Sequence, residues 1–256
     1  HLDELQKYEL FITGYRTLAA FAADRVLNVY NWGEYISDGS EGTLDVNAEF
    51  EKWYAETYGE TVKVVYTTYA SNEDLYAKLR SGAAGYDVIL PSDYMIARMI
   101  DEGMLEKLNF DNIPNYAGIS ENFRGLYYDA NDEYSVPFSY GMVGIIYDTT
   151  VVDEADTGTW DLMWNEKYKG KILQFNNSRD AFGSAMYRAG IDVNTTNRAD
   201  WQAALDALKA QKPILQGYVM DEVFNKMEGG EAAVAAYYAG DYLSMVENND
   251  KLGFYY

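Results

Sequence analysis

Aromatic and acidic side chains gather where a predicted strand ends. The stretch Tyr30–Ile36 (YNWGEYI) follows a β-branched run and turns at Gly33. Its aromatic rings, Trp32 and Tyr35, could attract a cation and cover its methylene groups, while Glu34 could neutralise the charge. Ligands of open α/β sheets lie at this strand edge, so the pattern favours an alkylammonium ligand. The plainer interpretation is a core tryptophan beside a solvated glutamate.

Three further strand ends carry the same residue types. Ser92 and Tyr94 follow one predicted strand, Asp180 follows another, and Tyr238 and Asp241 follow a third. A hydroxyl can accept from an ammonium, a tyrosine face can stack on methylenes, and a carboxylate can pair with the charge. Each place also has an ordinary interpretation as a helix cap, a helix-start acid or an acid paired with a neighbouring arginine. Repetition at four strand ends favours a binding site.

The sequence lacks the usual means of nucleophilic catalysis. It contains no cysteine, and its one histidine is His1. Disulfides, thiol nucleophiles and Cys–zinc sites are therefore excluded, and a Ser-His-Asp centre and a histidine-based metal site are both disfavoured. We predict no catalytic residue, no metal and no cofactor. A carboxylate-based glycoside hydrolase stays the alternative, because paired acids such as Asp180 and Asp241 could act on a sugar.

Length and charge narrow the class further. The chain has 256 residues, 48% of them hydrophobic, which suits two ordinary domains. Its formal charge is −21, which disfavours nucleic acid and anionic membranes as partners and tolerates a cationic ligand. The 25 tyrosines provide material for a core or for an aromatic cage around a ligand.

Strands alternate with helices from Val26 onwards. Apolar and β-branched runs predict extended segments at 26–30, 62–66, 86–90, 134–137, 142–147, 171–175 and 231–238. Helical spacing and capping residues predict helices at 46–57, 71–80, 94–102, 160–164, 180–189, 198–210 and 241–247. The turn-rich stretch 109–131 is expected to be surface connection. This alternation is typical of an α/β fold with parallel-rich sheets flanked by helices.

Several motifs together resemble one known family. The spermidine/putrescine-binding proteins of ABC importers share them, from about Val26 to the C-terminus; they lie at 30–36, 67–73, 76–79, 86–92, 134–138, 141, 164–170 and 240–241. The resemblance implies a two-lobed periplasmic-binding-protein fold (type II) that closes on its ligand at a hinge. We expect a leader or linker at 1–24, a first lobe at 25–137 and a second lobe at 138–256.

The resemblance also assigns site residues. It implies polyamine contacts in both lobes, made by Trp32, Glu34, Tyr35, Ser92, Tyr94, Asp180, Tyr238 and Asp241. Tyr238 stands where the family usually has a stacking tryptophan, and Asp241 matches an acid of putrescine-selective members. Asn177 stands where the spermidine-preferring pattern has an acid. Gly33 replaces a hydroxyl residue, and Tyr140 replaces a tryptophan.

The expected function follows from these residues and the resemblance. We expect an extracytoplasmic, monomeric, non-catalytic receptor, in the periplasm or at the outer face of the membrane, that captures putrescine or spermidine for ABC-transporter permease subunits. Some members of this family are fused behind the permease subunit, so we expect that this chain could be fused to or tethered by a permease in the same way. About a quarter of the family protein follows the position of Tyr256, so we expect a fragment or a variant whose first lobe is incomplete. An anion receptor of the same fold would need arginines where this chain has acids.

Overall fold

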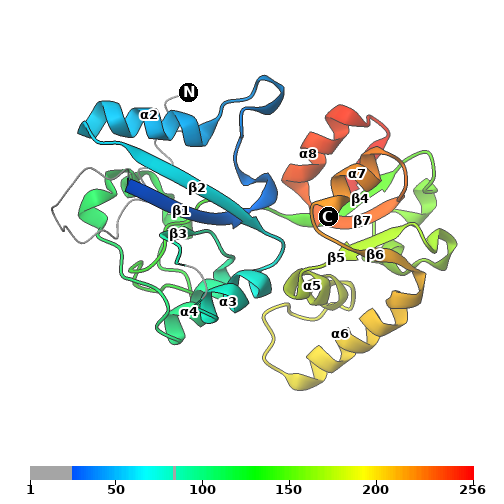
Figure 1. The fold of residues 1–256 in the computed structure, drawn as a ribbon. Helices are drawn as coiled ribbons and strands as arrows, with labels where there is room; N and C mark the ends of the chain where they lie inside the picture. Colours follow the sequence, from blue (N-terminus) through cyan, green and yellow to red (C-terminus); the bar gives the residue numbers. More distant parts are fainter. Residues whose placement is uncertain (1–24, 83–84) are drawn as a thin grey trace. The chain divides into compact units, whose positions relative to one another are not determined.

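The computed structural model describes residues 25–82 and 85–256, so the leader or linker predicted for 1–24 lies outside the described residues. The described chain forms two compact units, which divide between Ser139 and Tyr140. Each unit is built on its own sheet with helices on both faces (Figure 1). The predicted α/β class is confirmed.

The first unit contains a parallel three-stranded sheet in the order β2-β1-β3. β1 spans Arg25–Trp32, β2 spans Val62–Tyr69 and β3 spans Val88–Ile89. The α-helices of this unit are α2 (Val46–Tyr58), α3 (Asn72–Arg80) and α4 (Asp93–Asp101). α2 begins where the Asp45 side chain accepts from the Ala48 N–H, and it ends at Gly59, whose φ of 67° favours glycine.

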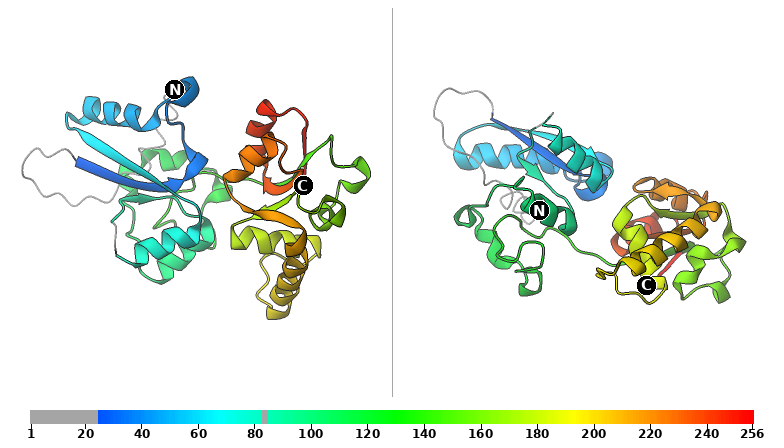
Figure 2. Two further views of the ribbon diagram at one scale, coloured as in Figure 1. Left: turned by 45° about the vertical axis from the view of Figure 1, so that its right-hand side comes forward. Right: turned by 90° about the horizontal axis from the view of Figure 1, so that it is seen from below.

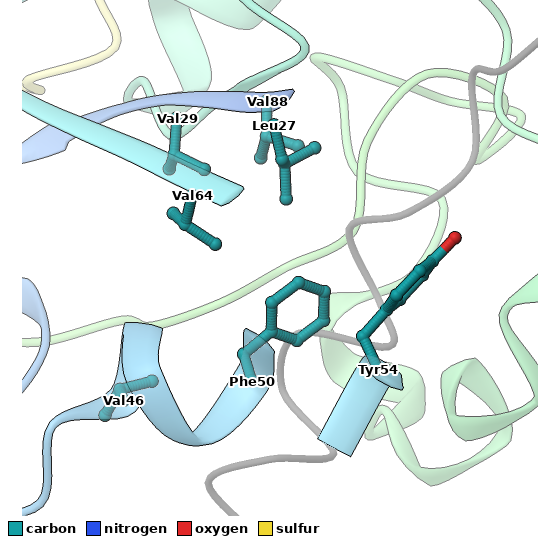
Figure 3. Packing of buried hydrophobic residues seen from close by; sticks show 7 residues of the cluster. All are labelled: Leu27, Val29, Val46, Phe50, Tyr54, Val64 and Val88. Carbon is teal, nitrogen blue, oxygen red and sulfur yellow. The ribbon is translucent and has the colours of Figure 1, made fainter. Parts of the chain in front are cut away.

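Alternation along β1 divides the core of this unit in two. Leu27 and Val29 pack against Phe50 of α2 on one face of the sheet. Tyr30 and Trp32 point to the other face, where they join the cluster formed with α3 and α4. Figure 3 shows the α2 side chains facing those of the three strands. Successive residues of a strand point to opposite faces, so this packing fixes which face receives Trp32.

The second unit contains a mixed five-stranded sheet in the order β6-β5-β7-β4-β8. Its strands are β4 (Val143–Asp148), β5 (Ile172–Phe175), β6 (Leu215–Val219), β7 (Val234–Tyr238) and β8 (Leu252–Tyr255). Its helices are α5 (Ser178–Arg188), α6 (Arg198–Gln211), α7 (Glu222–Glu228) and α8 (Ala239–Asn248). β5, β6 and β7 run parallel, whereas β4 runs antiparallel to β7 and β8. Figures 1 and 2 show α5 and α6 on one side of this sheet and α7 and α8 on the other.

Most predicted elements are present, with shifted ends. Among the described strands and α-helices, three were not predicted: β6, α7 and β8. The stretch 134–137 has irregular structure, and 160–164 is a 3₁₀ turn rather than a helix of α type. The helix predicted to open at Asp241 begins at Ala239. Among the described helices, none has the length and apolar composition needed to cross a membrane.

Candidate functional site

The carboxyl ends of the first sheet bring aromatic rings together. Because β1, β2 and β3 are parallel, their last residues meet at one edge. There Trp32 lies with its ring centroid 4.7 Å from that of Tyr69, its register partner on β2. The Tyr69 hydroxyl donates to the Leu90 carbonyl at 2.6 Å and so ties the end of β2 to the end of β3. Tyr69 is buried, and its ring packs against that of the predicted ligand residue Trp32.

Glu34 and Tyr35 extend this edge beyond Trp32. They lie in the 3₁₀ turn Gly33–Tyr35, and both side chains are exposed. The rings of Trp32 and Tyr35 are 6.4 Å apart. Burial raises the pKa of the nearby Tyr66 to about 12, and the negative charge of Glu34 acts in the same direction. The turn therefore places an exposed carboxylate between Trp32 and Tyr35 in the chain, at the carboxyl end of β1.

Ser92 and Tyr94 are joined by a residue that the sequence did not single out. The Asn72 side-chain amide donates to the Ser92 hydroxyl and to the Tyr94 hydroxyl, at 3.0 Å each. Ser92 occupies the N-cap position of α4, and its backbone N–H donates to Asn72 Oδ1 at 3.0 Å. The Tyr94 hydroxyl lies 3.2 Å from Glu73 Oε1, to which it donates. Asn72 and Glu73 fall in the motif 67–73, which carried the family resemblance but no assigned role.

The second unit has a comparable edge at the ends of its parallel strands. Asp180 lies in the first turn of α5, after β5, and Tyr238 is the last residue of β7. The Tyr238 hydroxyl donates to Asp180 Oδ2 at 2.7 Å. Asp241 lies in the first turn of α8, three residues beyond Tyr238. The structure thus brings Asp180 into direct contact with Tyr238, and Asp241 follows the same strand.

More acids gather at this edge than the sequence indicated. Tyr237 is buried, with 2% of its surface exposed. Burial raises its pKa above the ordinary value, and the charges of four acids act in the same direction: Asp241, Asp221, Glu222 and Asp180. Asp221 and Glu222 follow β6, the strand that was not predicted, which is why they were missed. Their position directly after Tyr218, Val219 and Met220 was the available signal.

Asn177 is part of the helix start rather than an exposed polar group. It is 4% exposed, and its side-chain oxygen accepts from the Arg179 N–H at 3.0 Å as the N-cap of α5. Within the second unit, Met142 and Val143 lie at this same edge, because the Met142 carbonyl accepts from the Ala239 N–H and Val143 pairs with Tyr238. In the first unit, Phe138 lies 5.9 Å from the Tyr35 ring.

Chemically, both edges offer acceptors and aromatic faces. Across residues 25–82 and 85–256, no three or more His, Cys, Asp or Glu side chains are arranged to hold a metal ion. Hydroxyl and carboxylate oxygens accept hydrogen bonds from N–H donors, and aromatic faces can cover the methylene groups of a ligand. Trp32, Glu34, Tyr35, Ser92 and Tyr94 belong to the first edge, and Asp180, Tyr238 and Asp241 to the second; that they contact a ligand stays a prediction.

Comparisons with known proteins agree with this fold. The family model described as bacterial extracellular solute-binding protein matches residues 45–255. The spermidine/putrescine-binding periplasmic protein of Escherichia coli is 31% identical over 87% of this chain and 61% of its own length. The putrescine-binding periplasmic protein of Pseudomonas aeruginosa is 29% identical over 88% of this chain and 61% of its own length. The chain therefore spans about three fifths of these curated relatives.

A solved structure gives the same picture. The substrate-binding protein of a spermidine/putrescine ABC transporter from Streptococcus pneumoniae aligns with a TM-score of 0.67 at 30% identity. The alignment covers 90% of this chain and 68% of that one. The names of all three relatives describe binding proteins.

Proposed function

The chain belongs to the bacterial extracellular solute-binding protein family, and we propose that it is a receptor that captures a polyamine, putrescine or spermidine, for uptake by an ABC transporter. The receptor works outside the cytoplasm, in the periplasm or at the outer face of the membrane. Its partners are the polyamine and the transporter's permease subunits. It acts as a monomer and performs no catalysis.

One observation carries this proposal: aromatic rings and carboxylates occur together at the carboxyl edge of each sheet. In the first unit Trp32 packs against Tyr69 and is followed by Glu34 in the next turn, and in the second Tyr238 donates to Asp180. A polyamine combines ammonium groups with apolar methylenes, so it needs both kinds of partner. An anionic solute would require basic groups at the strand ends, which here carry Glu34, Asp180 and Asp241.

We assign the ammonium groups to the acids and the methylenes to the rings. Glu34, Asp241 and Asp180 supply the carboxylates for the ammonium groups. Trp32, Tyr35 and Tyr238 cover the chain between the charges, and Ser92 and Tyr94 accept from ligand N–H groups. Two carboxylates suit a diamine because an unpaired ammonium is costly to bury.

Calorimetry tests the proposal directly. Putrescine, spermidine and spermine are titrated into the protein, with 1,4-butanediol as an uncharged control of the same chain length. We expect heat and a rise in melting temperature with at least one amine and neither with the diol. Absence of both signals with every amine at millimolar concentration would contradict the proposal for this chain.

The alternative, a carboxylate-based glycoside hydrolase, makes a different prediction. It requires sugar cleavage that is lost in Asp180→Asn or Asp241→Asn, because general acid–base catalysis needs both carboxyl groups. A broad panel of chromogenic glycosides separates the two functions. Turnover that depends on either acid would favour the hydrolase, and amine binding without turnover favours the receptor.

A further inference from the structure

Asn72 is a buried polar residue at the first edge, and its side chain is not the helix cap. It is 0% exposed and is the first residue of α3. The cap is the preceding Ser71, whose hydroxyl accepts from the Asp74 N–H at 3.1 Å. A buried amide must satisfy its own donors and acceptor. Asn72 does so entirely with Ser92 and Tyr94, two of the predicted ligand residues.

The direction of these hydrogen bonds is fixed by the partners. The Ser92 backbone N–H can only donate, so Asn72 Oδ1 must face it. The Nδ2 group, which can only donate, therefore faces the two hydroxyl oxygens. Each hydroxyl oxygen thus has one lone pair occupied by Asn72. The amide cannot be turned around without placing two donors against each other at Ser92.

Glu73 fixes the remaining proton of Tyr94. A carboxylate only accepts, and Glu73 Oε1 lies 3.2 Å from the Tyr94 oxygen. The Tyr94 oxygen accordingly accepts from Asn72 and donates to Glu73. A further partner of this oxygen can only be a donor. An ammonium is such a donor, and a carboxylate or sulfate oxygen is not.

From this geometry we propose that Asn72 is a positioning residue for polyamine binding. It holds the Ser92 and Tyr94 hydroxyl oxygens in place, and together with Glu73, which takes the Tyr94 proton, it leaves the Tyr94 oxygen able only to accept from a ligand N–H group. The inference rests on the proposed function and deepens it, since it gives the first edge a reason to select protonated amines. Asn72 acts through the two hydroxyls and does not itself touch the ligand.

A double-mutant cycle in putrescine affinity tests this role. Asn72→Ala is measured by calorimetry in the parent protein and in the Ser92→Ala/Tyr94→Phe background. In the parent we expect about a tenfold loss, which corresponds to about 1.4 kcal/mol and is the size of effect that one or two lost hydrogen bonds produce. In the background without hydroxyls the same change should cost less than about twofold, because residues that act through one network are not additive. Equal losses in both backgrounds would overturn the proposal and leave Asn72 a purely structural residue.

A second experiment changes Glu73 and leaves the buried Asn72 intact. Glu73 is exposed, so Glu73→Ala should fold normally. We expect it to weaken putrescine binding about threefold in the parent and to have no effect in Tyr94→Phe. Asp101→Ala removes the same charge from an exposed site at the end of α4 and serves as the matched control. If Asn72→Ala does not fold, an equal effect of Glu73→Ala in both backgrounds overturns the proposal.

The outcomes separate this inference from the proposed function. A parent protein that binds no amine contradicts the proposed function, and the positioning role falls with it. A parent protein that binds putrescine but shows equal losses in both backgrounds contradicts the positioning role alone. Spermidine is titrated in parallel, and the same pattern is expected, because the hydroxyls accept from any ligand N–H.

Discussion

Asp241 is the acid on which putrescine binding should depend most in the second unit. It lies in the first turn of α8, after the strand that ends in Tyr238. We expect Asp241→Asn to weaken putrescine binding by well over tenfold. Truncating one side of a buried charge pair costs about 2–5 kcal/mol, and about 1.4 kcal/mol corresponds to one decade in affinity.

The control for this measurement is Asp250→Asn, which removes one charge from an exposed position outside the edge. Calorimetry of both variants should show a loss for Asp241→Asn and parent-like affinity for Asp250→Asn. Unchanged putrescine binding in Asp241→Asn would show that this acid is wrongly assigned.

Tyr238 should contribute in two separable ways, through its hydroxyl and through its ring. Its hydroxyl holds Asp180 Oδ2 at 2.7 Å, and its ring lies 5.1 Å from that of Phe175. Tyr238→Phe keeps the ring, so we expect about a fivefold loss of affinity, equivalent to about 1 kcal/mol for one hydrogen bond. Tyr238→Ala should lose more, and by a similar factor for putrescine, spermidine and spermine, because methylenes are common to all three. Phe and Ala variants with identical affinity would speak against a stacking role.

Where β4 meets β8, the sheet of the second unit depends on a close approach at Gly144. A Cβ added there would overlap the Phe254 ring and the Tyr255 carbonyl oxygen of the neighbouring strand. We expect Gly144→Ala to lower the free energy of unfolding by about 1–3 kcal/mol, the usual cost of overpacking. Urea denaturation measures it.

Gly217→Ala in β6 is the matched control. A Cβ at that position would meet open space among the described residues, so its effect should stay within about 1 kcal/mol. Equal stability of the two alanine variants would mean that β8 can move away from β4 at little cost.

The sequence predicted those elements whose own pattern decides their structure. The run from Val26 to Tyr30 alternates, and Ser71 and Gly59 mark helix ends, so β1, α2 and α3 were found nearly complete. The sequence of β6 is Leu-Gln-Gly-Tyr-Val, in which the glycine and the glutamine weaken the strand pattern. The strand forms because its backbone pairs with that of β5. β8 likewise depends on pairing with β4.

In the candidate site, too, the sequence predicted residues that a local pattern marks and missed those whose role depends on distant partners. Trp32, Glu34 and Tyr35 could be proposed from the sequence because they follow one another at a strand end. Asn72 could not, because its role depends on Ser92 and Tyr94, which are 20 and 22 residues away along the chain. Asp221 was missed for a related reason, since its strand was not recognised.

At the scale of the whole molecule, the formal charge of −21 should draw a polycation towards the protein. A negative field raises the local concentration of cations and the rate of encounter. Salt screens this attraction, because the Debye length falls from about 30 Å at 0.01 M to about 10 Å at 0.1 M ionic strength. Spermidine carries more positive charge than putrescine at neutral pH, so its encounter rate depends more steeply on the field.

We therefore expect the association rate to fall as sodium chloride is raised from about 0.01 to 0.5 M, and to fall more for spermidine than for putrescine. Stopped-flow tryptophan fluorescence can follow this, because Trp32 lies at the proposed site. Sucrose at matched osmolality is the control, since it changes solvation without screening charge. Steering depends on total charge, so Asp250→Asn should reduce the salt dependence slightly while leaving the high-salt rate unchanged. An association rate that is independent of salt for both amines would mean that the acidic composition serves solubility and plays no part in capture.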